Sequence, residues 1–144
     1  MKKIAFFIVI AALVYGYAQE RGISLSHLAS FSSGADSALQ TAYRNHQSGL
    51  QIQGEGTVTR ILPDDLEGSR HQRFILKMDT GQTLLVAHNI DLAPRINGLE
   101  TGDTVEFFGE YEWNSKGGVI HWTHHDPNSL HTGGWLKHRG RTYN

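Results

Sequence analysis

The strongest constraint on the fold is an alternation of apolar and polar residues with a period of two, which begins at Leu50 and is clearest up to Trp113. Successive side chains of a β-strand point to opposite faces, so this pattern predicts strands that bury one face. Asp79-Thr80-Gly81 lies between two such runs and predicts a tight hairpin turn. Strands are predicted at 50–62 with a bulge, 73–78, 82–88, 104–113 and 119–124, followed by a small hairpin at 134–143.

Three strands, an irregular connection over 89–98 and two further strands give the element order of a five-stranded OB barrel. The predicted fold class is therefore mainly β, a five-stranded OB-like barrel with a short N-terminal capping helix. The helical spacing of Ala35, Leu39, Ala42 and Tyr43 predicts this helix, which would cover one open end of the barrel. A small β-sandwich or an SH3-like barrel is the competing architecture.

The first eighteen residues have the pattern of a secretory signal peptide. Lys2 and Lys3 precede an apolar run from Ile4 to Tyr15, and Gly16-Tyr17-Ala18 offers small residues for cleavage. The run is shorter than the roughly 20 residues of a spanning helix. The expected protein is periplasmic or secreted, with no stable membrane insertion after signal removal, or membrane-anchored if the signal stays uncleaved. The predicted division is 1–18 signal peptide, 19–34 flexible tether, 35–48 capping helix and 49–144 OB-like domain.

The composition excludes several functions. Without cysteine, the chain has no disulfide, thiol chemistry or cysteine-type zinc site. The formal net charge is −1, and loss of Lys2 and Lys3 with the signal leaves 11 basic against 14 acidic residues, a net charge of −3. This charge excludes a strongly basic nucleic-acid tail and weakens nonspecific attraction to phosphate.

Histidine has an uneven distribution, because five of the nine lie between His121 and His138. Imidazole and carboxylate ligands together suit Zn, Cu or Ni, so a divalent metal such as Zn is the expected cofactor class. In a continuous strand His121 and His125 would lie roughly 13 Å apart, so a site is expected only where the strand breaks. The candidate ligands are His121, His124, His125, Asp126 and His131. The alternative is that the histidines hydrogen-bond Glu110, Glu112 and the backbone and thereby brace the C-terminal loops.

Arginine, histidine and tryptophan side chains form a second candidate set, with the arginines around the first two predicted strands. Arginine binds phosphate and tryptophan stacks on bases or sugar rings, so the expected ligand is a nucleic acid or a glycan. The candidate ligand-binding residues are Arg70, Arg73, His88 and Trp122. The alternative is a solvated arginine face with the aromatic residues in the core.

A catalytic arrangement can be drawn from the same residues. His71 or His124 would act as general base, Asp126 or Glu110 would orient it, and Arg70 or Arg73 would stabilise an anionic transition state. This set suits hydrolysis of a phosphodiester. The sequence shows no serine or cysteine nucleophile arrangement.

Several long segments resemble those of a bacterial family of small exported proteins, catalogued as a domain of unknown function. These segments are Gly68–Phe74, Ala87–Arg95, Gly109–Trp113 and Gly117–Pro127, followed by Gly134-Trp135. The resemblance covers about Gln51 to Tyr143. It implies a shared fold and carries no known activity or binding residues.

Two segments, Val58–Asp65 and Leu84–Pro94, are also similar to OB-type nucleases of the staphylococcal class. The acidic residue after the proline in those enzymes is Arg95 here, and their Asp-Gly-Asp turn is Pro63-Asp64-Asp65. The chain therefore differs from those enzymes at residues on which their chemistry depends. The sequence as a whole indicates an exported OB-like binding domain with a histidine- and arginine-lined ligand or metal site. The alternatives are a metal-assisted or histidine-dependent hydrolase and a structural or partner-binding protein.

Overall fold

The computed structural model describes the backbone of residues 25–144 and the side chains from Gly34 onward. The chain divides into two compact units after Ser33, and the features below belong to the second unit, Gly34–Asn144. The predicted signal peptide and the first part of the predicted tether lie outside the described residues. Within residues 25–144, no helix combines the length and the apolar character needed to cross a membrane.

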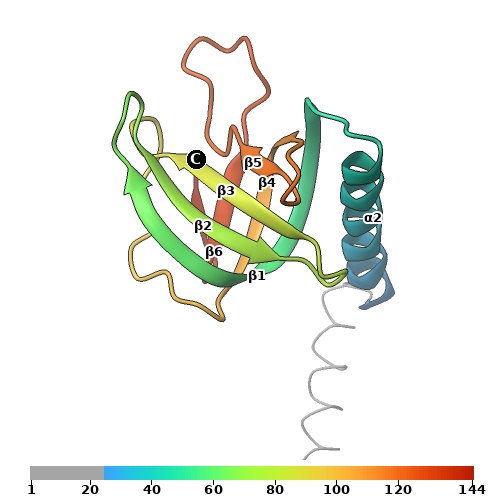
Figure 1. The fold of residues 1–144 in the computed structure, drawn as a ribbon. Coiled ribbons are helices and arrows are strands. Elements are labelled where there is room, and N and C mark those ends of the chain that lie inside the picture. Colours follow the sequence, from blue (N-terminus) through green and yellow to red (C-terminus); the bar gives the residue numbers. More distant parts are fainter. Residues whose placement is uncertain (1–24) are drawn as a thin grey trace, which may run out of the picture. The chain divides into compact units, whose positions relative to one another are not determined.

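The second unit contains one seven-stranded sheet, and five of its strands close into a ring (Figure 1). The strands are β1 Leu50–Asp65, β2 His71–Lys77, β3 Thr83–Asn89, β4 Thr104–Glu112, β5 Val119–His121, β6 Trp135–His138 and β7 Arg141–Tyr143. Around the ring the order is β1-β2-β3-β5-β4, and β4 pairs again with β1. The β3–β5 pairing is parallel, and the other ring pairings are antiparallel. The prediction of a mainly β fold is therefore confirmed.

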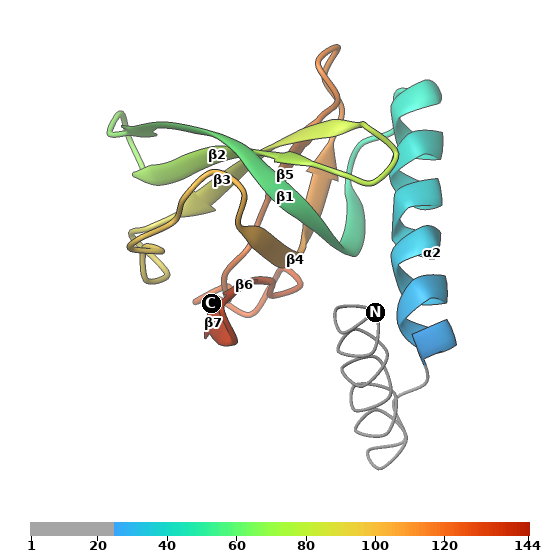
Figure 2. The ribbon, with the colours of Figure 1, turned by 90° about the horizontal axis from the view of Figure 1, so that it is seen from below.

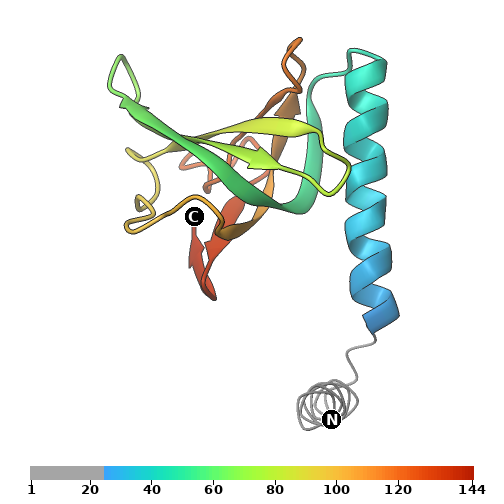
Figure 3. The same cartoon turned by 60° about the horizontal axis from the view of Figure 1, so that its bottom comes forward.

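The length and curvature of β1 allow it to close the ring. Its first half, Leu50–Thr57, pairs with β4, and its second half pairs with β2 (Figure 3). Two register shifts in the second half confirm the predicted bulge, a feature that bends a strand. Gly54 lies at the crowded inner side, where a Cβ would be 2.8 Å from the Phe107 ring.

The inner face of the ring carries the alternating apolar residues that the sequence predicts. Phe74 and Leu76 on β2 and Phe107 and Tyr111 on β4 are fully buried. Burial of each such side chain contributes about 1.5–3 kcal/mol to folding. The residues between them on the same strands point outward, and they include the polar side chains of the site described below.

The helix α2, Leu25–Arg44, begins ten residues before the predicted start at Ala35. Serine is a weak helix former but does not prohibit a helix, so the serine-rich segment predicted as a tether contributes helical residues. In the second unit, Leu39 and Ala42 of α2 are fully buried in the same core as the strands. The Leu39 carbonyl accepts a hydrogen bond from Gln82 Nε2 at 3.4 Å.

The predicted C-terminal hairpin is confirmed by β6 and β7, and β6 pairs with β4 (Figure 2). Arg139 and Gly140 in its turn have positive φ angles of 48° and 78°. Positive φ at both central residues is typical of a type I′ turn, which matches the twist of the flanking strands.

Candidate metal centre

Two carboxylates and one imidazole meet on the outer face of β4 and β5. Glu110 and Glu112 are two residues apart on β4, so both side chains lie on the same face. His121 on β5 is paired directly with Glu110. One ligand atom from each residue lies within 4.8 Å of the other two, and among the described residues no other group of three or more does so.

The distances in this group fit a shared ion better than they fit hydrogen bonds. His121 Nε2 is 3.6 Å from Glu110 Oε2 and 3.5 Å from Glu112 Oε1. The same nitrogen is buried and has no hydrogen-bond partner among the described residues, a costly state for a polar atom. Two ligands that are each about 2.05 Å from a tetrahedral ion lie about 3.3 Å from one another, which is close to both distances.

His131 brings a second imidazole to the same carboxylate. Its Nε2 lies 2.9 Å from Glu110 Oε2, and its Nδ1 lies 2.8 Å from the carbonyl oxygen of Thr132. A carbonyl oxygen only accepts, so Nδ1 must carry a proton, and the contact with the ionised carboxylate needs another proton on Nε2. A metal ion can replace that second proton. Metal-ligating histidines commonly have their other nitrogen held by a backbone carbonyl in this way.

His131 lies in the loop between β5 and β6, whose path can be followed in Figure 1. The Asp126 carboxylate accepts hydrogen bonds from the backbone N–H groups of Asn128, Leu130 and His131. These bonds, the one from Asn128 above all, hold the pKa of Asp126 below its ordinary value. The imidazole of His131 stacks on the indole of Trp122, with 3.9 Å between ring centroids and 12° between planes. His131 is therefore held beside Glu110 by the bond of its backbone N–H to Asp126 and by the stacking of its ring on Trp122.

The break in β5 lies after His121, three residues before the predicted strand end at His124. Trp122 has a φ of 53°, in the left-handed region that large residues rarely adopt. The backbone is crowded here, because a Cβ on Gly109 would lie 2.6 Å from the His121 carbonyl oxygen. A Cβ on Gly134 would overlap the carbonyl oxygen of Trp122. The break leaves His121 on the sheet beside Glu110.

A pocket of about 240 Å³ adjoins the cluster of Glu110, Glu112 and His121, and His121 belongs to both. Its lining includes His71 and His124. The Nδ1 of His71 donates to the Ser69 carbonyl at 2.8 Å, and the Nδ1 of His124 donates to the His125 carbonyl at 2.7 Å. A larger pocket of about 590 Å³, next to α2 and the turn before β5, has neither histidine nor carboxylate in its lining. Of these two pockets, the smaller one therefore lies beside the candidate histidines and carboxylates.

Of the five predicted metal ligands, His121 belongs to the cluster, His131 contacts its member Glu110, and the other three lie elsewhere. His124 lines the adjoining pocket. His125 is exposed, and the carboxylate of Asp126 binds the backbone of its own loop. Of the residues predicted to be catalytic, His71 and His124 share this pocket, whereas Arg73 and Asp126 do not line it.

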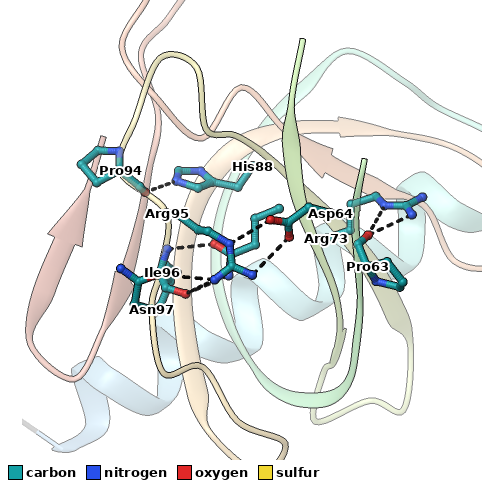
Figure 4. Close-up of polar contacts among 9 residues, drawn as sticks. Pro63, Asp64, Arg73, His88, Pro94, Arg95, Ile96 and Asn97 are labelled. Carbon is teal, nitrogen blue, oxygen red and sulfur yellow. Dashed lines mark hydrogen bonds and ion pairs between the residues drawn. The ribbon is translucent and has the colours of Figure 1, made fainter. Parts of the chain in front are cut away.

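The two predicted ligand-binding arginines are bonded within the protein. Arg70 forms an ion pair with Asp91 at 2.7 Å. Arg73 donates two hydrogen bonds to the Pro63 carbonyl, at 3.0 and 3.1 Å (Figure 4). Neither arginine lines the pocket beside the cluster, whereas Trp122 does.

His88, also predicted to bind a ligand, is fully buried and joins three segments. Its Nε2 donates to the Pro94 carbonyl at 3.0 Å (Figure 4), and its Nδ1 accepts from the Thr123 hydroxyl at 2.7 Å. Burial lowers the pKa of His88 to about 4, so the imidazole is neutral near pH 7. Its contacts are those of a structural brace.

Asp64 and Arg95 occupy positions at which the sequence departs from the staphylococcal nucleases. Their side chains form an ion pair at 2.9 Å (Figure 4). The guanidinium at the position of the acidic residue is therefore paired with a carboxylate of this chain.

The sequence predicts Glu110 and Glu112 as hydrogen-bond partners of histidines, and Glu110 also as a group that orients a catalytic base, but it predicts neither as a metal ligand. Their alternation on the strand at 104–113 placed both on the outer face, which is the signal that could have found them. Asn89, which lines the pocket, was missed because its place depends on its pairing with His71 in the β2–β3 register.

The fold and the cluster define a mainly β domain with a carboxylate–imidazole group on its outer face. Residues 22–144 match the model of a family described as a protein of unknown function, DUF3465. The chain belongs to this family, which confirms the family resemblance of its segments. Comparison with the curated proteins gave no match.

Proposed function

We propose that this protein is an OB-like binding domain that holds one divalent transition-metal ion at Glu110, Glu112, His121 and His131. The observation that carries the proposal is the buried Nε2 of His121, which has no hydrogen-bond partner among the described residues. This nitrogen faces two carboxylates at distances suited to shared coordination. An ion would satisfy the nitrogen and both carboxylates at once.

The donor set selects the class of metal. Two imidazole nitrogens and two carboxylate oxygens suit Zn²⁺, Cu²⁺ or Ni²⁺, whereas Ca²⁺ and Mg²⁺ prefer oxygen ligands alone. Two carboxylate charges balance the charge of a divalent ion. The side chains of His131 and Glu112 are partly exposed, so an ion can reach the cluster from solvent. The ion would displace the proton between His131 and Glu110, and binding therefore weakens as pH falls.

The OB-like part of the proposal is supported by strand order. The ring order β1-β2-β3-β5-β4, the renewed pairing of β4 with β1 and the parallel β3–β5 pair are those expected of a five-stranded OB fold. The cluster lies on β4 and β5 of this ring.

We also propose that the protein acts outside the cytoplasm. The support is the sequence itself, in which Lys2 and Lys3, the apolar run Ile4–Tyr15 and Ala18 follow the pattern of a cleaved signal.

Thermal unfolding with and without Zn²⁺ tests the metal proposal. Ligand at 100 times its dissociation constant stabilises a folded protein by about 2.7 kcal/mol, and a 100-fold loss of affinity reduces this to about 0.4 kcal/mol. Glu110→Gln keeps the size of the side chain but removes a charged ligand, so its Zn²⁺-induced shift in Tm should nearly disappear. Glu112→Gln should reduce the shift as well.

His125→Ala is the matched control, because it removes a neighbouring exposed imidazole outside the cluster. It should keep the full Zn²⁺-induced shift. Equal shifts in the original protein and in Glu110→Gln would contradict the proposed site. Circular dichroism in the absence of metal shows whether each variant is folded.

A further inference from the structure

The pocket beside the carboxylate–imidazole cluster has no acidic or basic residue other than histidine in its lining, whereas the cluster contains two carboxylates. The pocket is lined by Ser69, His71, Ala87, Asn89, Leu92, His121, Trp122 and His124. None of these residues carries a formal charge when histidine is neutral. We therefore expect its ligand to be recognised by neutral hydrogen bonds and by packing.

Three polar side chains that line this pocket, His71, Asn89 and His124, each have one atom bonded to the protein and another without a protein partner among the described residues. The Nδ1–H groups of His71 and His124 are donated to backbone carbonyls, which leaves Nε2 of each neutral imidazole as an acceptor. The Oδ1 of Asn89 accepts from the N–H groups of Asp91 at 2.9 Å and Leu92 at 3.2 Å, so its NH₂ group remains to donate. The hydroxyl of Ser69 can do both.

This mixture of acceptors and donors selects the chemistry of the ligand. An oxyanion only accepts hydrogen bonds and would meet the lone pairs of His71 and His124. An ammonium group only donates and would meet the NH₂ of Asn89. A hydroxyl group both donates and accepts, so a ligand with several hydroxyls satisfies every available group.

Size and shape narrow the ligand further. A volume of about 240 Å³ corresponds to about eight waters' share of liquid volume, which is the scale of one sugar ring. Trp122 supplies an aromatic wall, and its position is fixed by the stack with His131 and by its left-handed backbone. Ala87 and Leu92 add apolar surface for the C–H groups of a ring.

We propose that this pocket binds a single neutral sugar residue, free or at the end of a glycan. His71, Asn89 and His124 hydrogen-bond its hydroxyls, and Trp122 packs against its ring. His121 lines this pocket and also belongs to the carboxylate–imidazole cluster, but the side chains proposed to bind the sugar are not among the proposed metal ligands.

Saturation-transfer NMR on the purified protein at neutral pH tests the proposal. The probes are the methyl glycosides of glucose, galactose and N-acetylglucosamine at millimolar concentration. At least one of them should receive saturation. Asn89→Asp keeps the oxygen that holds Asp91 and Leu92 but replaces the NH₂ group, so affinity should fall about tenfold, as expected for one lost hydrogen bond.

His71→Leu, which removes the Nε2 acceptor of the residue paired with Asn89 across β2 and β3, should weaken binding to a similar degree. His125→Ala should leave affinity unchanged. The proposal is overturned if no glycoside receives saturation, or if binding is the same in Asn89→Asp and His71→Leu as in the original protein. Competition by inorganic phosphate at neutral pH would also overturn it, because the pocket would then be an oxyanion site. Circular dichroism confirms the fold of each variant.

Discussion

The buried imidazole of His88 should make the protein lose stability in mild acid. Burial lowers the pKa of His88 from 6.5 to about 4, so the folded protein resists protonation at a pH where the unfolded chain accepts a proton. Above pH 6.5 both states are neutral and the group adds no pH dependence. Between pH 6.5 and 4 the unfolded state binds more protons, and the free energy of unfolding falls by about 1.4 kcal/mol per pH unit. The total loss is about 3 kcal/mol, and it levels off below pH 4.

Urea unfolding followed by tryptophan fluorescence measures this loss, with His88→Gln as the comparison. Glutamine stays neutral throughout and can still donate and accept hydrogen bonds. The original protein should be the more stable of the two at pH 7, and its advantage should shrink by about 3 kcal/mol by pH 4. Carboxylates common to both proteins cancel in this difference. A stability difference that does not change between pH 7 and pH 4 would refute the assignment of a neutral, buried His88.

Two further predictions concern the crowded strand end and the N-terminus. Gly109→Ala should destabilise the protein by about 1–3 kcal/mol in urea unfolding and weaken Zn²⁺ binding, because the new Cβ would lie 2.6 Å from the His121 carbonyl oxygen. Gly34→Ala is its control; it has nothing within 4 Å, should add about 0.5–1 kcal/mol as a helix residue, and should leave Zn²⁺ binding unchanged. If both glycine variants bind Zn²⁺ equally well, His121 is not held by this contact. For the export proposal, intact mass of protein expressed with its own N-terminus should show a chain that begins at Gln19, and a chain that keeps Met1 would contradict cleavage.

The sequence predicted the strands well because alternation is a local property. The buried positions Phe74, Leu76 and Phe107 follow directly from a period of two. The end of β5 could not be predicted, because it depends on the left-handed backbone of Trp122 and on the close approach of Gly109 and Gly134 from other parts of the chain. The predicted start of α2 is ten residues too late, because the serine-rich segment before Ala35 is helical although serine is a weak helix former.

The candidate site was predicted only in part, for a related reason. The composition indicated histidine as the residue type and the segment from His121 to His138 as the region. The predicted ligands included His121 and His131. The meeting of His121 with Glu110 requires the β4–β5 register, which connects residues that the alternation alone leaves unpaired. The contact between His131 and Glu110 depends on a loop that Asp126 holds in shape. Spacing along the chain therefore favoured His124 and His125. The fold instead brings the glutamates of β4 close to His121 and His131.

The most direct measurement of the metal proposal is an anomalous difference map recorded at the zinc absorption edge from crystals grown with Zn²⁺. We expect one strong peak on the outer face of β4 and β5, with His121 Nε2 and a Glu110 oxygen each about 2.0–2.2 Å away. His131 Nε2 should have moved from its hydrogen bond with Glu110 onto the ion. A map with no peak at this cluster, or with its strongest peak on other residues, would contradict the account.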